Sequence, residues 1–303
     1  MILDVLTGGV RGGTAILYAA LGETLAERAG VINLGTEGSM LTGALAAYAV
    51  TAETGSPWAG VVAGAAAGGL LALVHAVLVL SRGANQLATG LVVLFLGLGL
   101  TSMFGVAYVG ASITPFRPVA IPLLSDVPWL GPIFFTQDPL VYASYLAAPA
   151  MWWLLHRSRW GLTVRGAGER PEVLAAYGKN PLVVRYLAVV GGGLLAGVGG
   201  AHLSTAYANA WFENMTAGRG FIAVALVIFA AWHPLRAVGG AYLFGAALAL
   251  SPALQARGYG FNQFALDALP YLVTILALVL LARRQVNSAP EGLSRVFELT
   301  PAR

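Results

Sequence analysis

Long apolar runs, separated by short polar stretches, dominate this chain of 303 residues. An α-helix needs about 20 mainly apolar residues to cross the hydrocarbon core of a bilayer, so each run predicts a membrane span. The pattern therefore predicts an all-α fold, a polytopic transmembrane helical bundle of about nine spans that includes broken helices. The predicted spans are residues 3–21, 34–52, 58–80, 87–109, 139–156, 183–207, 219–233, 238–254 and 264–282.

Composition agrees with this pattern. Hydrophobic residues make up 58% of the chain and charged residues 10%, and the mean hydropathy is +0.76. Soluble domains carry about 25% charged residues, so the chain is expected to be an integral membrane protein. Residues 1–285 are predicted to form one transmembrane domain with a polar loop at 157–182, and residues 286–303 a loosely ordered cytoplasmic tail. The net charge of +4 comes from loops between spans, so it indicates topology rather than nucleic-acid binding.

The basic loops also predict how the bundle is oriented. Cytoplasmic loops carry an excess of Lys and Arg, and the loop 157–182 carries the densest charge in the chain. With this loop in the cytoplasm, the N-terminus lies outside and the C-terminus inside. Gly22–Asn33 fits least well, because it would be a cytoplasmic loop with two acidic residues and one arginine. Alternation also places Arg82, His233–Arg236 and Arg283–Arg284 inside, and Glu53, Gly110–Asp138 and Asn209–Gly218 outside.

The charged loop contains the pattern of a short capped helix. Glu169–Glu172 has the sequence Glu-Arg-Pro-Glu, in which proline suits a first helical turn and the acidic groups complement the helix dipole. Val173–Tyr177 then gives a short amphipathic segment, and Gly178 suits the C-terminal cap. Such a helix between two spans suits docking against a water-soluble partner. The alternative is an ordinary positive-inside loop.

Two glycine-rich stretches, Gly30–Gly38 and Glu213–Phe221, precede apolar runs and share an order of residue types. Each has an Asn, then small residues, then a charged residue followed by Gly. With the orientation above they enter from opposite sides, as expected for an inverted repeat with broken helices in a transporter. The alternative is that both are ordinary helix N-termini, where polar residues are common.

Polar residues near the ends of the predicted spans could line a path for a solute. Because most of them are neutral, they suit an uncharged solute that forms hydrogen bonds better than an ion, and an aromatic ring could stack on it. The alternative is that they join helices to one another, as polar groups commonly do in membrane bundles. The candidate pathway residues are Asn33, Glu37, Asn85, Gln86, Thr89, Asn209, Phe212, Asn214 and Arg219.

Motifs for chemistry within the chain are lacking. The sequence contains no HExxH, no GxSxG and no GxxxxGK(S/T) pattern, and its four histidines lie in separate segments. There is no cysteine, so thiolate metal sites are excluded. We therefore predict no catalytic residue, no metal and no cofactor bound by this chain.

Three segments resemble a known family. Glu23–Tyr48, Trp160–Ser204 and Phe212–Gly245 are similar to permease subunits of bacterial ABC importers, in the branch of the branched-chain amino acid and ribose permeases. Within that branch, ERAGVINLGTEG and ENMTAGRGFI most resemble permeases of nucleoside importers, which are often named simple-sugar permeases.

This resemblance implies a multi-pass protein of the bacterial cytoplasmic (inner) membrane, embedded in lipid, that imports a nucleoside or a related polar solute. It implies an ATPase partner that binds ATP on two fused nucleotide-binding domains, a second permease in a heterodimer, and a substrate-binding lipoprotein. The alternatives are an ABC permease for simple sugars and a secondary transporter driven by an ion gradient. In this resemblance, the coupling helix that docks on the ATPase contains Glu169, Arg170, Pro171, Glu172, Leu174, Tyr177 and Gly178.

Overall fold

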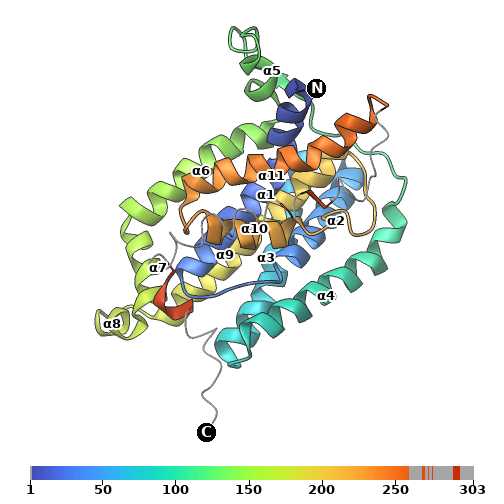
Figure 1. The fold of residues 1–303 in the computed structure, drawn as a ribbon. Helices are drawn as coiled ribbons and strands as arrows, with labels where there is room; N and C mark the ends of the chain where they lie inside the picture. The colour runs from blue at the N-terminus through green and yellow to red at the C-terminus, as the bar shows by residue number, and fades with distance from the viewer. Residues whose placement is uncertain (1, 259–267, 270–271, 273–274, 276–288, 294–303) are drawn as a thin grey trace.

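The computed structural model describes residues 2–258, 268, 269, 272, 275 and 289–293, and these form a helical bundle (Figure 1). The ninth predicted span, 264–282, lies almost entirely outside the described residues, as does most of the tail 286–303. The helices are α1 (Ile2–Arg28), α2 (Thr36–Thr54), α3 (Pro57–Ala76), α4 (Gln86–Gly105), α5 (Leu130–Phe134), α6 (Pro139–Arg157), α7 (Arg159–Glu169), α8 (Pro171–Ala176), α9 (Pro181–His202), α10 (Arg219–Phe229) and α11 (Pro234–Gln255).

Short π-helical turns extend two of these helices, Val77–Ser81 after α3 and Leu203–Tyr207 after α9, and a 3₁₀ turn, Val106–Tyr108, extends α4. Among the described residues, four helices are long and apolar enough to cross a membrane: Pro57–Ser81, Gln86–Tyr108, Pro181–Tyr207 and Pro234–Gln255. The described chain is mostly helical, as predicted, with these four helices suited to crossing a membrane. The count of nine spans stays a prediction.

Local sequence explains where several helices begin. Ser56, Asp138 and Asn180 each stand directly before a proline, and their side chains accept hydrogen bonds from backbone N–H groups of the first helical turn. The three helices are α3, α6 and α9. A short polar residue satisfies the otherwise unpaired N–H groups, and proline has no N–H to satisfy and a backbone angle already suited to a helix.

Two predicted boundaries differ from the structure. Helix α1 continues through Gly22 to Arg28, because Glu23 and Glu27 are buried and hydrogen-bonded rather than exposed in a loop. Helix α10 has only 11 residues. At 1.5 Å per residue it is about 16 Å long, roughly half of the hydrocarbon core, so it cannot form the predicted span 219–233 by itself.

Glycine allows two helix pairs to pack with their backbones in close contact. Helix α3 lies on α9, where a Cβ added to Gly197 would come 2.2 Å from the carbonyl oxygen of Gly64. Helix α11 lies on α1, where a Cβ added to Gly245 would come 2.1 Å from the carbonyl oxygen of Gly9. If α1–α3 and α9–α11 are two copies of one unit, then α1 corresponds to α9 and α3 corresponds to α11. The contact of α3 with α9 then corresponds to the contact of α11 with α1. The packing therefore agrees with an internal repeat.

The loops gather at two ends of the bundle, as the alternating topology requires. At one end the backbone N–H of Ile32 donates to Gln86, and the hydroxyls of Ser81 and Tyr186 share a hydrogen bond of 2.5 Å. At the other end Trp58 makes an edge-to-face contact with Phe116, in the segment Gly110–Asp138. Helix α8 lies at one end of the bundle, and α5 and the N-terminus of α1 lie at the opposite end (Figure 1).

Two segments outside the bundle helices are ordered by local contacts. In Gly110–Asp138, β1 (Val119–Ala120) pairs antiparallel with β2 (Thr136–Gln137). In the described part of the tail, Leu293 is only 2% exposed and belongs to the hydrophobic core, and the backbone N–H of Glu291 donates to the carboxylate of Glu169 at 3.2 Å. Residues 289–293 therefore pack against the bundle, while the tail 286–303 as a whole stays a prediction.

Candidate functional site

Helix α8 is the short helix that the charged loop predicts. Pro171 occupies its first turn together with Glu172. At its other end the N–H of Lys179 donates to the carbonyl of Leu174 at 3.3 Å, the N–H of Gly178 donates to that of Ala175 at 2.9 Å, and Gly178 has φ +74°. This pair of bonds is a Schellman motif, which satisfies carbonyls at the helix end and needs a left-handed residue. Both predicted ends of the helix are confirmed.

One side of α8 packs against the bundle and the other side is exposed. Leu174 packs against the hydrophobic core, whereas Tyr177 is 82% exposed. Between α7 and α8 lies a groove of about 830 Å³. Its lining mixes apolar and charged side chains: Arg159, Leu162, Thr163, Gly166, Glu169, Arg170, Val173, Leu174, Tyr177, Lys179 and Glu291.

A buried carboxylate holds the first glycine-rich stretch. Glu23 of α1, 2% exposed, accepts hydrogen bonds from the backbone N–H of Asn33 and the hydroxyl of Thr36, both at 2.8 Å. The side chain of Asn33 in turn accepts from the N–H of Gly35 at 2.9 Å. The turn that starts α2 is therefore ordered by polar groups inside the bundle, where an unpaired backbone group would cost several kcal/mol.

A second buried carboxylate joins the two glycine-rich stretches to each other. One oxygen of Glu37, on α2, accepts from the Thr216 hydroxyl at 2.6 Å and from the N–H of Gly218 at 2.8 Å, and the other accepts from the N–H of Gly220. Gly218 stands directly before α10 and Gly220 lies in its first turn, and the Gly218 N-cap offers no side-chain hydrogen bond of its own. A negative charge at a helix N-terminus is favourable, so Glu37 serves as the cap of a helix that begins 182 residues further along the chain, at Arg219.

Helix α10 follows a non-helical segment with unusual backbone angles. Asn209, Asn214 and Ala217 have positive φ values of 53°, 55° and 45°. The segment lies along α4, where Ser102 donates to the carboxylate of Glu213 and the Trp211 indole lies against Gly105. Segment 208–218 therefore lies beside α4 as a non-helical stretch that leads into the short helix α10, and the broken-helix repeat stays a prediction.

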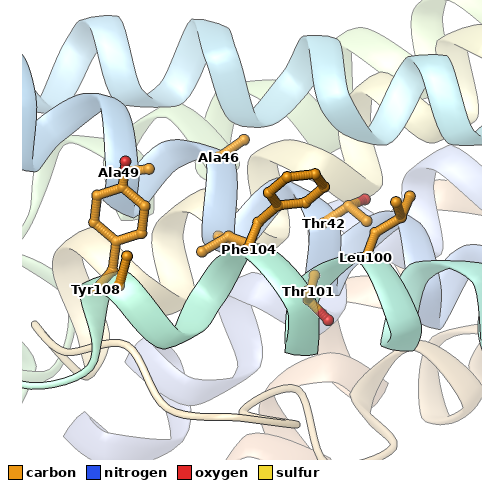
Figure 2. A pocket seen from close by; sticks show the side chains of 9 residues that line it. Thr42, Ala46, Ala49, Leu100, Thr101, Phe104 and Tyr108 are labelled. Atoms are coloured by element: carbon orange, nitrogen blue, oxygen red, sulfur yellow. The ribbon is translucent and has the colours of Figure 1, made fainter.

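Helices α2 and α4, with the turn Val106–Tyr108, form an open groove of about 490 Å³ (Figure 2). Thr42, Thr101 and Tyr108 contribute its hydroxyls, and those of Thr42 and Thr101 already donate to carbonyls of their own helices, those of Gly38 and Gly97. The groove is therefore mainly apolar. Its lining is Thr42, Leu45, Ala46, Ala49, Leu100, Thr101, Phe104, Ala107 and Tyr108.

The candidate pathway residues occupy three kinds of position, and their roles stay predictions. Phe212, Asn209 and Asn214 are exposed on segment 208–218. Others bond to the backbone: Asn85 caps α4, Gln86 accepts from Ile32, and the Arg219 guanidinium donates to carbonyls of Met215 and Thr216. Asn33, Glu37 and Thr89 are buried.

The sequence interpretation missed a set of polar contacts at the ends of α1 and α10. Trp232 donates its indole N–H to Glu27 at 2.5 Å, and the Arg28 guanidinium donates to the carbonyl of Trp232. Arg185 on α9 donates to the carbonyls of Ala29 and Ala167. The spacing of Glu23 and Glu27, four residues apart on an otherwise apolar segment, could have revealed this set of contacts. Residues with that spacing share one face of a helix.

Comparison with known proteins shows the family to which this bundle belongs. Residues 5–282 match the family described as the permease component of the branched-chain amino acid transport system. The chain belongs to this family and is a membrane-spanning permease subunit of an ABC transporter, an integral protein of the cytoplasmic membrane. The resemblance found in the sequence is thus confirmed.

Three relatives align along most of their length with this chain. TsgC13 of Haloferax volcanii, a glucose ABC transporter permease by its provisional name, is 46% identical over 267 residues, 87% of this chain and 80% of TsgC13. The guanosine ABC transporter permease NupQ of Bacillus subtilis is 35% identical, covering 87% of both chains. The nucleoside ABC transporter permease NupC of Lactococcus lactis subsp. cremoris is 30% identical, covering 93% of both. No solved structure gives a significant match.

Proposed function

We propose that this chain forms half of the translocation pathway of an ATP-driven importer for a nucleoside or a related polar solute. Family membership supports the ATP-driven class, and the names of NupQ and NupC support the nucleoside substrate. The partners are an ATPase subunit with two fused nucleotide-binding domains, a second permease that completes a heterodimer, and a substrate-binding lipoprotein. ATP is bound and hydrolysed on the ATPase subunit, and this chain is not itself an enzyme.

The observation that carries the proposal is the construction of α8. A six-residue helix is too short to be stable by its own propensity, yet this one is fixed by a proline start, a Schellman end and the anchor Leu174. A rigid, exposed element of this kind can transmit force from a partner. We assign Glu169, Arg170, Pro171, Glu172, Leu174, Tyr177 and Gly178 to ATPase docking, with the groove between α7 and α8 as part of that surface.

The proposed orientation places the end of the bundle that carries α8 in the cytoplasm, with the N-terminus of α1 outside and nine spans in all. Arg82 and Arg236 then lie inside with α8, as the positive-inside rule favours. Segment 208–218 and the groove between α2 and α4 face the solute path beside the second permease. There the exposed ring of Phe212 would stack on a base, and Asn209 and Asn214 would bind its polar edges.

Transport assays test the class and the substrate together. Cells that express this chain with its ATPase, second permease and binding protein should take up radiolabelled guanosine, and vanadate should inhibit the uptake. Uptake that persists with vanadate and is abolished by a protonophore alone would identify an ion-driven transporter instead.

Glucose is the second candidate substrate, because the 46% identical relative carries that name. Competition decides between the two: unlabelled guanosine should suppress guanosine uptake while an equal concentration of glucose leaves it unchanged. Vanadate-sensitive uptake of glucose without guanosine uptake would assign the transporter to simple sugars.

A further inference from the structure

Helix α10 is held at both of its ends by polar side chains from other helices. Glu37 of α2 accepts bonds from the first turn of α10, beside segment 208–218. At the other end, Glu27 and Arg28, from the last turn of α1, bind the residues that follow α10. Both ends of this 11-residue helix are thus attached to neighbouring helices.

The turn after α10 has a strained backbone. Ala231 and Trp232 are consecutive non-glycine residues with positive φ values of 52° and 54°. A left-handed conformation costs roughly 1–2 kcal/mol for a residue with a Cβ atom, so two in succession persist only where the surroundings hold them. We call this turn, with Glu27 and Arg28, the α10 joint.

Side-chain contacts hold the joint in that conformation. Trp232 is 5% exposed, its indole N–H donates to the Glu27 carboxylate at 2.5 Å, and Glu27 is 1% exposed. The Arg28 guanidinium donates to the carbonyl of Trp232 at 3.2 Å through Nη2 and at 3.3 Å through Nε. Hydrogen bonds between a charged group and a buried partner are among the stronger ones in proteins, so these contacts can offset the backbone strain.

The same end of α1 is also tied to the helices that carry α8. Arg185 of α9 donates to the carbonyl of Ala29 at 3.1 Å and to that of Ala167, in the last turn of α7, at 2.8 Å. A Cβ added to Gly168 would come 2.3 Å from the carbonyl oxygen of Arg28, so the backbones of α7 and α1 touch. The contacts therefore run without a gap from α7 and α8, through the end of α1, to α10 and segment 208–218.

We propose that Arg185, Arg28 and Trp232 are positioning residues that transmit movement of the coupling helix α8 to α10 and thereby to the solute path. The inference rests on the proposed function, since it assumes an ATPase that moves α8. When α7 and α8 move, the carbonyl of Ala167 displaces Arg185 and the end of α1. Because Arg28 and Glu27 are hydrogen-bonded to the strained turn, α10 moves with the end of α1. Glu37, which is hydrogen-bonded to both α10 and segment 208–218, then couples this displacement to segment 208–218.

The test separates transmission from folding. The full transporter complex is reconstituted in lipid vesicles with its ATPase, and two rates are measured per complex: uptake of radiolabelled guanosine, or of glucose if that is the substrate, and ATP hydrolysis. Trp232→Phe keeps an aromatic ring but removes the indole N–H, and with it the hydrogen bond that Glu27 accepts. Arg28→Lys keeps the charge but loses the planar guanidinium, whose two N–H groups donate to the carbonyl of Trp232. The controls are Trp153→Phe, at a residue 58% exposed, and Arg236→Lys, at an exposed arginine.

We expect uptake per ATP hydrolysed to fall by about fivefold or more in Trp232→Phe and Arg28→Lys, the lower end of the range for coupling between sites. The controls should match the wild type. A purely structural role would lower both rates together, through fewer intact complexes, and an unchanged ratio in Trp232→Phe would overturn the inference. A wild-type complex without vanadate-sensitive uptake of either solute would instead refute the proposed function, and the inference with it.

A second readout follows α10 directly. This chain has no cysteine, so Ala217→Cys, at an exposed residue of segment 208–218 that is not assigned to solute binding, places one environment-sensitive fluorophore on the chain. Addition of ATP and vanadate should change the fluorescence in an otherwise wild-type complex, and Arg28→Lys should abolish that change. A change of the same size with Arg28→Lys would show that movement reaches segment 208–218 by another route.

Discussion

Substitution of Glu37 offers the sharpest test of how the two glycine-rich stretches, Gly30–Gly38 and Glu213–Phe221, are joined. Its two oxygens accept three hydrogen bonds from segment 208–218 and α10, and the side chain is 3% exposed. In Glu37→Gln the remaining oxygen can keep the bonds from Thr216 and Gly218. The new amide group then faces the N–H of Gly220, so two donors oppose each other and one backbone group loses its partner. The substitution changes only one heavy atom, and therefore leaves the packing intact.

The expected loss of stability follows from those bonds. A hydrogen bond to a charged group contributes about 1.5–3 kcal/mol in soluble proteins, and side-chain bonds inside membrane bundles average nearer 0.6 kcal/mol. Loss of one charge-assisted bond, together with an unpaired N–H, therefore predicts about 2 kcal/mol for Glu37→Gln. Glu37→Ala removes both oxygens, and with them three hydrogen bonds, and should cost about 3–5 kcal/mol. For a large domain, 2 kcal/mol corresponds to a fall of about 4–8 °C in Tm.

The assay is the Tm of the purified complex in detergent, read from the fraction that stays monodisperse by size-exclusion chromatography after heating. The matched control is Glu53→Gln, because Glu53 lies on the same helix α2 but is exposed, and surface substitutions usually change stability by less than about 0.5 kcal/mol. If the Tm of Glu37→Gln equals that of Glu53→Gln, the Glu37 carboxylate does not cap α10. The conclusion that it joins the two glycine-rich stretches is then wrong.

Three further predictions concern docking and packing. Glu172→Arg combined with Arg170→Glu reverses the charges at the start of α8, so it should abolish uptake and ATPase coupling while membrane insertion stays normal; normal transport by this variant would remove the docking role. Gly178→Ala places a Cβ at φ +74°, which should destabilise the end of α8 by about 1 kcal/mol and weaken binding of the ATPase in a pull-down, whereas Gly99→Ala, which meets nothing within 4 Å, should leave binding unchanged. Gly197→Val should separate α3 from α9 and reduce the yield of folded protein severely, and a normal yield would contradict the close backbone packing.

Apolar run lengths predicted much of this fold, because they depend on local sequence and on the thickness of the bilayer. Helix α8 was predictable residue by residue, since proline, glutamate and glycine act on the backbone next to them. Helix α10 was not, because an apolar run does not show that a helix stops short of spanning. The roles of Glu23 and Glu37 were hidden for a related reason: their partners lie up to 183 residues away, and only the folded chain brings them together.

The most direct measurement asks which side of the membrane carries α8. Tyr177→Cys introduces a single thiol at a residue that is 82% exposed, and Asp126→Cys does so in the segment proposed to lie outside. A membrane-impermeant maleimide should label Tyr177→Cys in inside-out vesicles but not in intact cells, and Asp126→Cys in intact cells but not in inside-out vesicles. Labelling of Tyr177→Cys from outside intact cells would contradict the account, because a coupling helix must face the compartment that holds the ATPase.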